Sequence, residues 1–132
     1  MLDFSNEIFN GVASSLRSLY PGIQVKGEYV SEPAKFPCVT IDEISNIPSH
    51  LDSAAKNKYA DVVYRVQVFS NKEGGKRAEA RAIYNTVDEV LMGLGLFAKS
   101  YTSTPTIYNA EIYSITATFG GVIGEDGTVY RN

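Results

Sequence analysis

The chain has 132 residues, with 12 basic and 15 acidic side chains, a formal net charge of −3 and one cysteine. This length suits a single domain spanning residues 1–132, and the mild negative charge argues against a groove for nucleic-acid phosphates, which needs clustered lysines and arginines. The lone Cys38 excludes an internal disulfide and a cysteine-cluster metal site.

The N-terminal part of the chain predicts a helix followed by a short strand. Apolar side chains recur at helical spacing over residues 4–20, and Pro21 and Gly22 then end the helix. Residues 23–30 alternate between apolar and polar, which is typical of a strand, although Gly27 weakens it. The apolar stripe of the helix contains Ile8, Phe9, Val12, Leu16 and Leu19.

A proline-bearing loop over residues 31–37 comes next, in which Phe36 is a candidate plug for the edge of the sheet. A second strand is predicted over residues 39–44. Residues 45–57 are polar and show no period, so we expect a long hairpin loop. Long loops without secondary structure are usually functional or disordered, which makes residues 46–57 the first place to look for a partner contact.

The long strand over residues 60–69 has two different faces. Its even positions, Val62 to Val68, are all apolar and predict a core face. Its odd positions mix Val63 and Phe69 with Arg65 and Gln67, so this second face is half apolar. We expect it to be partly buried against a neighbouring subunit or against the C-terminal arm.

After Gly74 and Gly75 the period becomes helical and stays so until residues 92–95. Strands are predicted over residues 96–102 and 109–119, and a tight turn at residues 126–127 predicts a ribbon of residues 122–125 against 128–131. The helix stripe consists of Ala80, Ile83, Tyr84, Val87, Val90, Leu91 and Leu94. The predicted core face of the strand over residues 109–119 consists of Tyr113, Ile115, Ala117 and Phe119.

These elements predict an α+β fold. It consists of a mainly antiparallel sheet of four to five strands with two helices packed on one face, plus a C-terminal β-ribbon arm. No apolar run is long enough to cross a membrane, and the N-terminus lacks the basic and apolar segments of a signal peptide.

The residues that could carry chemistry are few. His50 is the only histidine, and it lies in the predicted polar loop. The sequence therefore does not support a Ser-His-Asp or Cys-His catalytic set or a histidine metal site within one chain. Asp42, Glu43 and Asp61 could hold a hard cation across two strands, although neighbouring carboxylates are more often surface charges. The sequence therefore favours a protein without catalytic, cofactor or metal residues, and a small metal-dependent enzyme stays an alternative.

Gly74 and Gly75 precede a basic helix start, which invites a phosphate-loop interpretation, but the segment matches neither GxxxxGK[ST] nor GxGxxG. A nucleic-acid module could also use the basic residues of this region. Those residues are Lys72, Lys76, Arg77 and Arg81.

Nine tyrosines favour assembly, because tyrosine is enriched in protein interfaces. Four of them fall at strand ends or in loops: Tyr59, Tyr101, Tyr108 and Tyr130. Such positions are explained equally well by tyrosines that bury the ring at a sheet edge and keep the hydroxyl in water. The candidate residues for an oligomer or partner interface are Arg65, Gln67, Phe69, His50, Asp52, Tyr59, Asp126, Tyr130 and Arg131.

Four segments together resemble the small tail terminator, or tail completion, proteins of long-tailed bacteriophages. They are FPCVTIDEI (36–44), YRVQVFSN (64–71), GGKRAEARAIYNTVDEVL (74–91) and IYSITATFGGVIGEDGTVYRN (112–132). The resemblance covers nearly the whole chain in order and spacing.

The resemblance implies a structural virion protein that is made in the bacterial cytoplasm and forms a ring, commonly of six subunits. Such a ring sits on the head-proximal end of the tail tube, stops its growth and joins the head connector. The implied partners are further copies of the chain, the tube protein and the connector protein, with genome DNA passing through the lumen. Another neck subunit, such as a head-closure protein, is the alternative.

Overall fold

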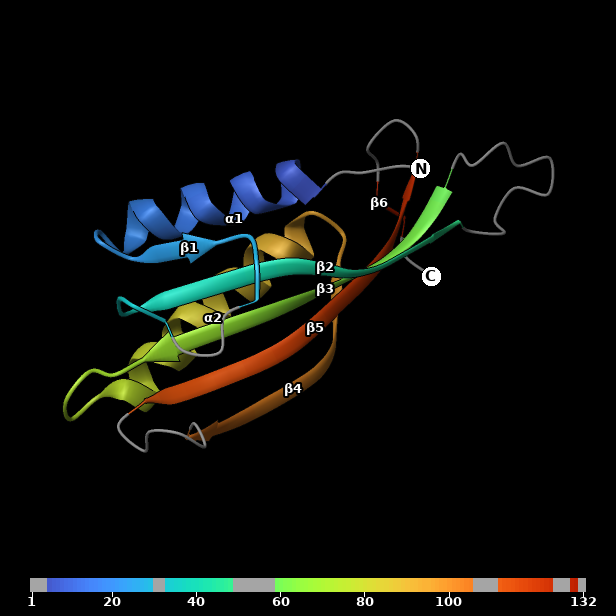
Figure 1. Cartoon of the computed structure of the whole chain (residues 1–132). Helices are drawn as coiled ribbons and strands as arrows, with labels where there is room; N and C mark the ends of the chain where they lie inside the picture. The colour runs from blue at the N-terminus through green and yellow to red at the C-terminus, as the bar shows by residue number, and fades with distance from the viewer. Residues whose placement is uncertain (1–4, 30–32, 49–58, 106–111, 125–128, 131–132) are drawn as a thin grey trace.

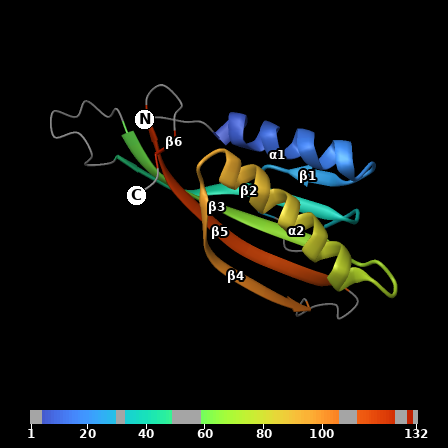
Figure 2. The same cartoon turned by 180° about the vertical axis from the view of Figure 1, so that it is seen from behind.

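The computed structural model describes residues 5–29, 33–48, 59–105, 112–124 and 129–130. Two helices, α1 and α2, lie on one face of a sheet with strand order β1-β2-β3-β5-β4, and β6 pairs with β5 (Figures 1 and 2). The fold is α+β, as predicted. The element bounds are α1 Ser5–Leu19, β1 Gln24–Lys26, β2 Cys38–Pro48, β3 Tyr59–Ser70, α2 Lys76–Gly93, β4 Phe97–Pro105, β5 Tyr113–Gly124 and β6 Val129–Tyr130.

Helix α1 packs through the predicted stripe, with one exception in its last turn. Ile8, Val12 and Leu16 are buried, whereas Leu19 is 62% exposed. Tyr20, the residue after the helix, packs against the core where Leu19 was expected. The prediction for Leu19 is therefore wrong, because Tyr20, whose N–H still makes a helical hydrogen bond to the carbonyl of Leu16 at 2.7 Å, takes the core position one residue later.

Helix α2 ends in a motif that turns the chain into β4. Gly95 adopts a φ of 94°, in the left-handed region, and its N–H donates to the carbonyl of Met92 at 2.9 Å. The N–H of Leu96 donates to the carbonyl of Leu91, also at 2.9 Å. This pair of bonds is the Schellman motif, in which glycine takes a conformation that other residues rarely adopt. Both leucines are buried, so the turn is fixed by packing as well.

Strand β1 is shorter than predicted and runs parallel to β2, which makes the sheet mixed. It ends at Lys26, directly before Gly27, which agrees with the weakening expected from a glycine. All other described strand pairs are antiparallel.

Strand β2 continues four residues beyond its predicted end, to Pro48. The register with β3 shifts between Glu43 and Ser45, so Ile44 is an extra residue in β2. Such a β-bulge reverses the apolar and polar alternation, which is the signal used to recognise a strand. The prediction of a loop from residue 45 was wrong for this reason. Residues 49–57 of that predicted loop lie outside the described residues.

Strand β5 continues through Gly120 and Gly121, which the sequence predicted as the end of the strand. Gly120 pairs with β3 on one side and with β4 on the other, and a Cβ added to it would collide with the side chain of Lys99. The two glycines therefore continue the strand and do not break it, and the flexible end of the Lys99 side chain lies against Gly120. The predicted ribbon pairing exists, because Val122 and Ile123 pair with β6. Its first strand is the end of β5, however, and not a separate arm.

The core lies between the sheet and the two helices. The even positions of β3 and the predicted core face of β5 are all buried, which confirms both face assignments. The same core contains the predicted α2 residues from Ala80 to Leu91, whereas Leu94 is 40% exposed. No described helix is both long and apolar enough to cross a membrane.

Tyr84 of α2 predicts a stability loss at high pH. Its side chain is 8% exposed, and its ring lies 5.0 Å from the Tyr101 ring and 6.2 Å from the Phe119 ring. Burial, helped by the Asp88 and Tyr101 charges, raises the pKa of Tyr84 from 10.0 to about 12. The unfolded chain therefore loses this proton first. The contribution of protonated Tyr84 to the free energy of unfolding is fully present below pH 10.0 and is lost as the pH rises through about 12.

Urea unfolding of the wild type and of Tyr84→Phe across this alkaline range measures the effect. The wild type should lose stability more steeply than the phenylalanine variant, because phenylalanine has no proton to lose. Parallel pH profiles for the two proteins would contradict the prediction.

Candidate functional site

A group of polar contacts on the outer face of the sheet, opposite the helices, is centred on Arg65. Its guanidinium makes two parallel hydrogen bonds to Asp42, at 3.2 Å from Nε and 2.6 Å from a terminal nitrogen. It also lies 4.4 Å from the centre of the Tyr29 ring. Planar pairing with a carboxylate and stacking on an aromatic ring are the contacts that arginine makes better than lysine.

The remaining part of the predicted interface on β3 is covered from within the chain. Gln67 is 5% exposed and accepts a hydrogen bond from Thr40 at 2.7 Å. Phe69 is 3% exposed and packs with Ile112 and Phe36. The prediction that a neighbouring subunit or the C-terminal arm covers these two residues is corrected, since both are buried within the chain, Phe69 against Ile112 and Phe36 and Gln67 beside Thr40. Phe36 is the plug that the sequence predicted.

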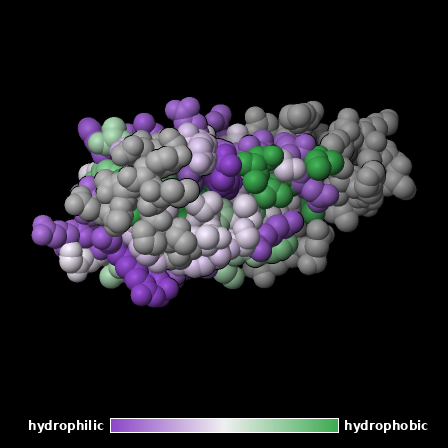
Figure 3. Space-filling view, turned by 60° about the horizontal axis from the view of Figure 1, so that its bottom comes forward, coloured by the Kyte–Doolittle hydropathy of each residue, from purple (hydrophilic) through white to green (hydrophobic). Residues whose placement is uncertain are grey.

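A further part of the outer face is apolar. Ile47 is 58% exposed and Phe97 is 38% exposed, and together with Val63 they line a hollow of about 320 Å³ beside Asp61 and Lys99. Figure 3 shows hydrophobic side chains gathered next to hydrophilic ones on this side of the molecule. The sequence did not predict this cluster, because the bulge in β2 and the continuation of β5 place its members together.

The three carboxylates considered as a metal site do not converge. Asp42 faces the outer side and is bound to Arg65, whereas Glu43 accepts hydrogen bonds from Tyr64 at 3.1 Å and from Asn46 at 3.2 Å. Asp61 lies opposite Ile47, further along the strand pair. Among the described residues, no three His, Cys, Asp or Glu side chains are grouped to hold a metal ion.

Cys38 is buried in the small cluster around Phe69, and burial raises the pKa of its thiol. A thiol with a raised pKa is a poor nucleophile, and the residue packs as a small apolar side chain.

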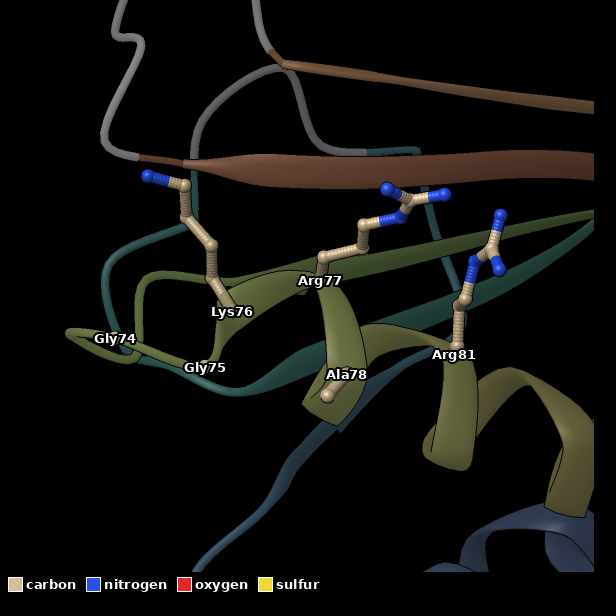
Figure 4. Close-up of a pocket in the computed structure, with 6 residues that line it drawn as sticks. All are labelled: Gly74, Gly75, Lys76, Arg77, Ala78 and Arg81. Atoms are coloured by element: carbon tan, nitrogen blue, oxygen red, sulfur yellow. The ribbon is translucent and has the colours of Figure 1, made fainter.

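The start of α2 carries a basic hollow. Lys76, Arg77 and Arg81 line an open space of about 530 Å³ together with Gly74 and Gly75. Figure 4 shows the three basic side chains extended on the same side of α2 and pointing away from α1. None of them makes an ion pair with a described residue. The surface can attract an anionic group, but the backbone does not form a phosphate-binding loop of a known pattern.

The other predicted interface residues divide into two groups. Tyr59 pairs with Gly124 and Tyr130 pairs with Val122, so the structure brings both to the same end of β5, on opposite sides of it. His50, Asp52, Asp126 and Arg131 lie outside the described residues. Sequence reasoning missed Tyr29 as the aromatic partner of Arg65, since no pattern connects these two positions.

Comparison with known proteins gives a family and a fold. Residues 12–128 match the family model described as tail completion protein gp17. A chain in the structure described as "Virion of native gene transfer agent (GTA) particle" superposes with a TM-score of 0.64 at 17% identity, covering 89% of this chain and 91% of that chain. No curated protein sequence matches. The match to the family model extends over nearly the whole chain, and the chain therefore belongs to the tail completion protein gp17 family, a structural, non-enzymatic component of the tail of phage-like virions.

Proposed function

We propose that the chain, acting as a single domain, forms a ring that caps the head-proximal end of the tail tube. The ring stops tube growth and provides the surface that joins the head. The observation that carries this proposal is the family match over residues 12–128, since tail completion requires contact with an already assembled tail.

The described surface is compatible with an adaptor. The outer face has an ordered Arg65–Asp42 pair and an exposed apolar cluster, both of which suit contact with other protein chains. The chain has a formal net charge of −3, and a mildly acidic lumen would let genome DNA pass without binding. The proposed partners are further copies of the chain, with six in the ring, the tube protein and the connector protein.

Deletion of the gene, followed by imaging of the tails, tests the proposal. A tail without its terminator should grow to irregular length and fail to join a head, and supply of the wild-type chain should restore both properties. Tails of normal length that lack only heads would instead assign the chain to head closure. Particles with normal tails and heads would contradict both functions. Labelling the chain in assembled particles gives an independent position, at the tube end or in the neck.

A further inference from the structure

Strand β4 forms one free edge of the sheet. No described strand pairs with it on the side away from β5, and its residues from Phe97 to Thr102 are all exposed. Two of these side chains are aromatic, with exposed fractions of 38% for Phe97 and 44% for Tyr101. An unpaired strand with exposed aromatic side chains is a ready template for pairing with another chain.

The other free edge is the second half of β2. Strand β1 pairs only with Cys38 to Thr40, so from Ile41 onward no described strand covers this side of β2. Ile44 is 46% exposed here, and Tyr29 is 54% exposed in the segment after β1. We call these surfaces the β4 edge (β4 with Arg77 and Arg81 of α2) and the β2 edge (residues 41–48 with Glu28 and Tyr29).

The β4 edge is basic. Arg77 and Arg81 lie at helical spacing from Tyr84, whose ring contacts Tyr101 of β4, so they share the side of α2 that faces this strand. Lys99 adds a third cation on β4 itself, although its side chain lies over Gly120 on the outer face, in the hollow that Asp61 also lines. Asp88 is the one acidic residue on this side of the helix. Arg77 and Arg81 make no ion pair with a described residue, so the charge of these two arginines is uncompensated within the described chain.

The β2 edge is acidic. Glu28, Asp42 and Glu43 line a hollow of about 520 Å³ between α1 and β2. Arg65 neutralises Asp42, whereas Glu43 receives hydrogen bonds only from neutral groups, and Glu28 is exposed without a described ion pair. Glu28 and Glu43 therefore have no cationic partner among the described residues of this edge.

The two edges lie on opposite sides of the molecule. Figures 1 and 2 show α1 along the β1 and β2 side of the sheet and β4 at the far edge, and the arginines of α2 point away from α1 in Figure 4. Contact between two β4 edges, or between two β2 edges, would oppose like charges. Contact between unlike edges matches the charges and leaves one edge of each kind free for the next copy, which is the head-to-tail contact from which a ring is built when the rotation between copies closes.

We propose that, in the ring, the β4 edge of one copy docks on the β2 edge of the next copy. This inference rests on the proposed ring function and specifies the contact between neighbouring subunits. Charge pairs between Arg77, Arg81 or Lys99 on one copy and Glu28 or Glu43 on the next fix the orientation, and the exposed aromatic and isoleucine side chains supply the apolar contact.

Two complementary variants test the contact. Arg81→Glu with Lys99→Glu makes both edges acidic, and Glu28→Lys with Glu43→Lys makes both edges basic. Each variant alone should assemble at a concentration at least about tenfold higher than the wild type, because like charges face each other. An equimolar mixture should recover assembly into rings in which the two variants alternate, so that only even numbers of copies occur.

Native mass spectrometry of the purified chains, alone and on tail tubes from particles that lack this protein, counts the copies and distinguishes the variants by mass. Glu89→Lys and Arg17→Glu are matched controls, because both residues are exposed and lie away from the two edges, and both should assemble like the wild type. Glu28→Lys alone is the reserve variant if loss of the Tyr64 contact unfolds the double variant. It should shift assembly in the same direction, by a smaller factor.

The outcomes separate this inference from the proposed function. If the wild type forms no ring either alone or on tubes, the ring function fails. If the wild type forms rings and both charge variants do so equally well, only the edge-to-edge contact is overturned. Variants that form normal rings but no longer bind tubes would assign these edges to the tube protein, and the inference would again be wrong.

Discussion

Replacement of Phe119 by alanine should lower the free energy of unfolding by about 3 to 5 kcal/mol, the range for a fully buried aromatic side chain. Phe119 has no exposed surface and lies in β5 between Tyr64 of β3 and Ala98 of β4, with its ring 6.2 Å from the ring of Tyr84. Its removal leaves a cavity bounded by rigid strands on both sides and by α2 above. Denaturant unfolding monitored by circular dichroism measures the loss.

Phe97→Ala is the matched control, because Phe97 lies on the next strand but is 38% exposed. It should cost less than about 1 kcal/mol, since exposed substitutions away from buried features have small effects. Because Phe97 belongs to the β4 edge, the same variant should weaken assembly while the fold stays intact. Equal losses of stability for the two phenylalanines would contradict the core assignment.

Replacement of Arg65 by glutamate should cost about 2 kcal/mol, because it removes two charge-assisted hydrogen bonds and places a negative charge beside Asp42. The side chains are 30% and 17% exposed, so solvent screens this pair less than an ion pair at the free surface. Arg65→Lys should cost about half as much. Lysine keeps the charge, but it cannot make two parallel hydrogen bonds to Asp42 or stack equally well on Tyr29.

A double-mutant cycle with Asp42→Asn isolates the pair from the other contacts of Arg65. In the Asp42→Asn background, Arg65→Lys should have a clearly smaller effect than in the wild type, as measured by urea unfolding. Equal effects in both backgrounds would show that the Asp42 contact contributes little. If Arg65→Glu stays folded and assembles like the wild type, Arg65 is not part of an interface.

Most of the elements could be predicted from periodicity, and the errors have a common cause. The stripe of α2 from Ala80 to Leu91 and the core face of β3 each follow one period, and both were predicted correctly, whereas Leu94 at the end of the stripe is exposed. Strand β2 was predicted too short because the extra residue Ile44 reverses its alternation. The end of β5 was missed because glycine usually marks a break, whereas Gly120 makes room for Lys99 of the neighbouring strand. Local patterns do not contain this contact between distant residues.

The candidate surfaces were harder to predict than the fold. The half-apolar face of β3 was recognised from the sequence, but its cover comes from Phe36 and Ile112, which are distant in the chain. Whether such a face is covered from within or by another molecule depends on the path of the connecting segments, which sequence patterns do not specify. The same limitation hid the β4 and β2 edges, because edges exist only once the strand order is known.

The strand order also determines when the molecule can become complete during synthesis. Strand β5 lies between β3 and β4 in the sheet, yet it follows both of them in the chain. Until β5 is made, one edge of β3 and the inner edge of β4 have no strand to pair with. Only the emergence of residues 113–124 joins the two halves. We therefore expect that a nascent chain of this topology exposes unpaired strand edges, which favour aggregation, until its last long strand has been made.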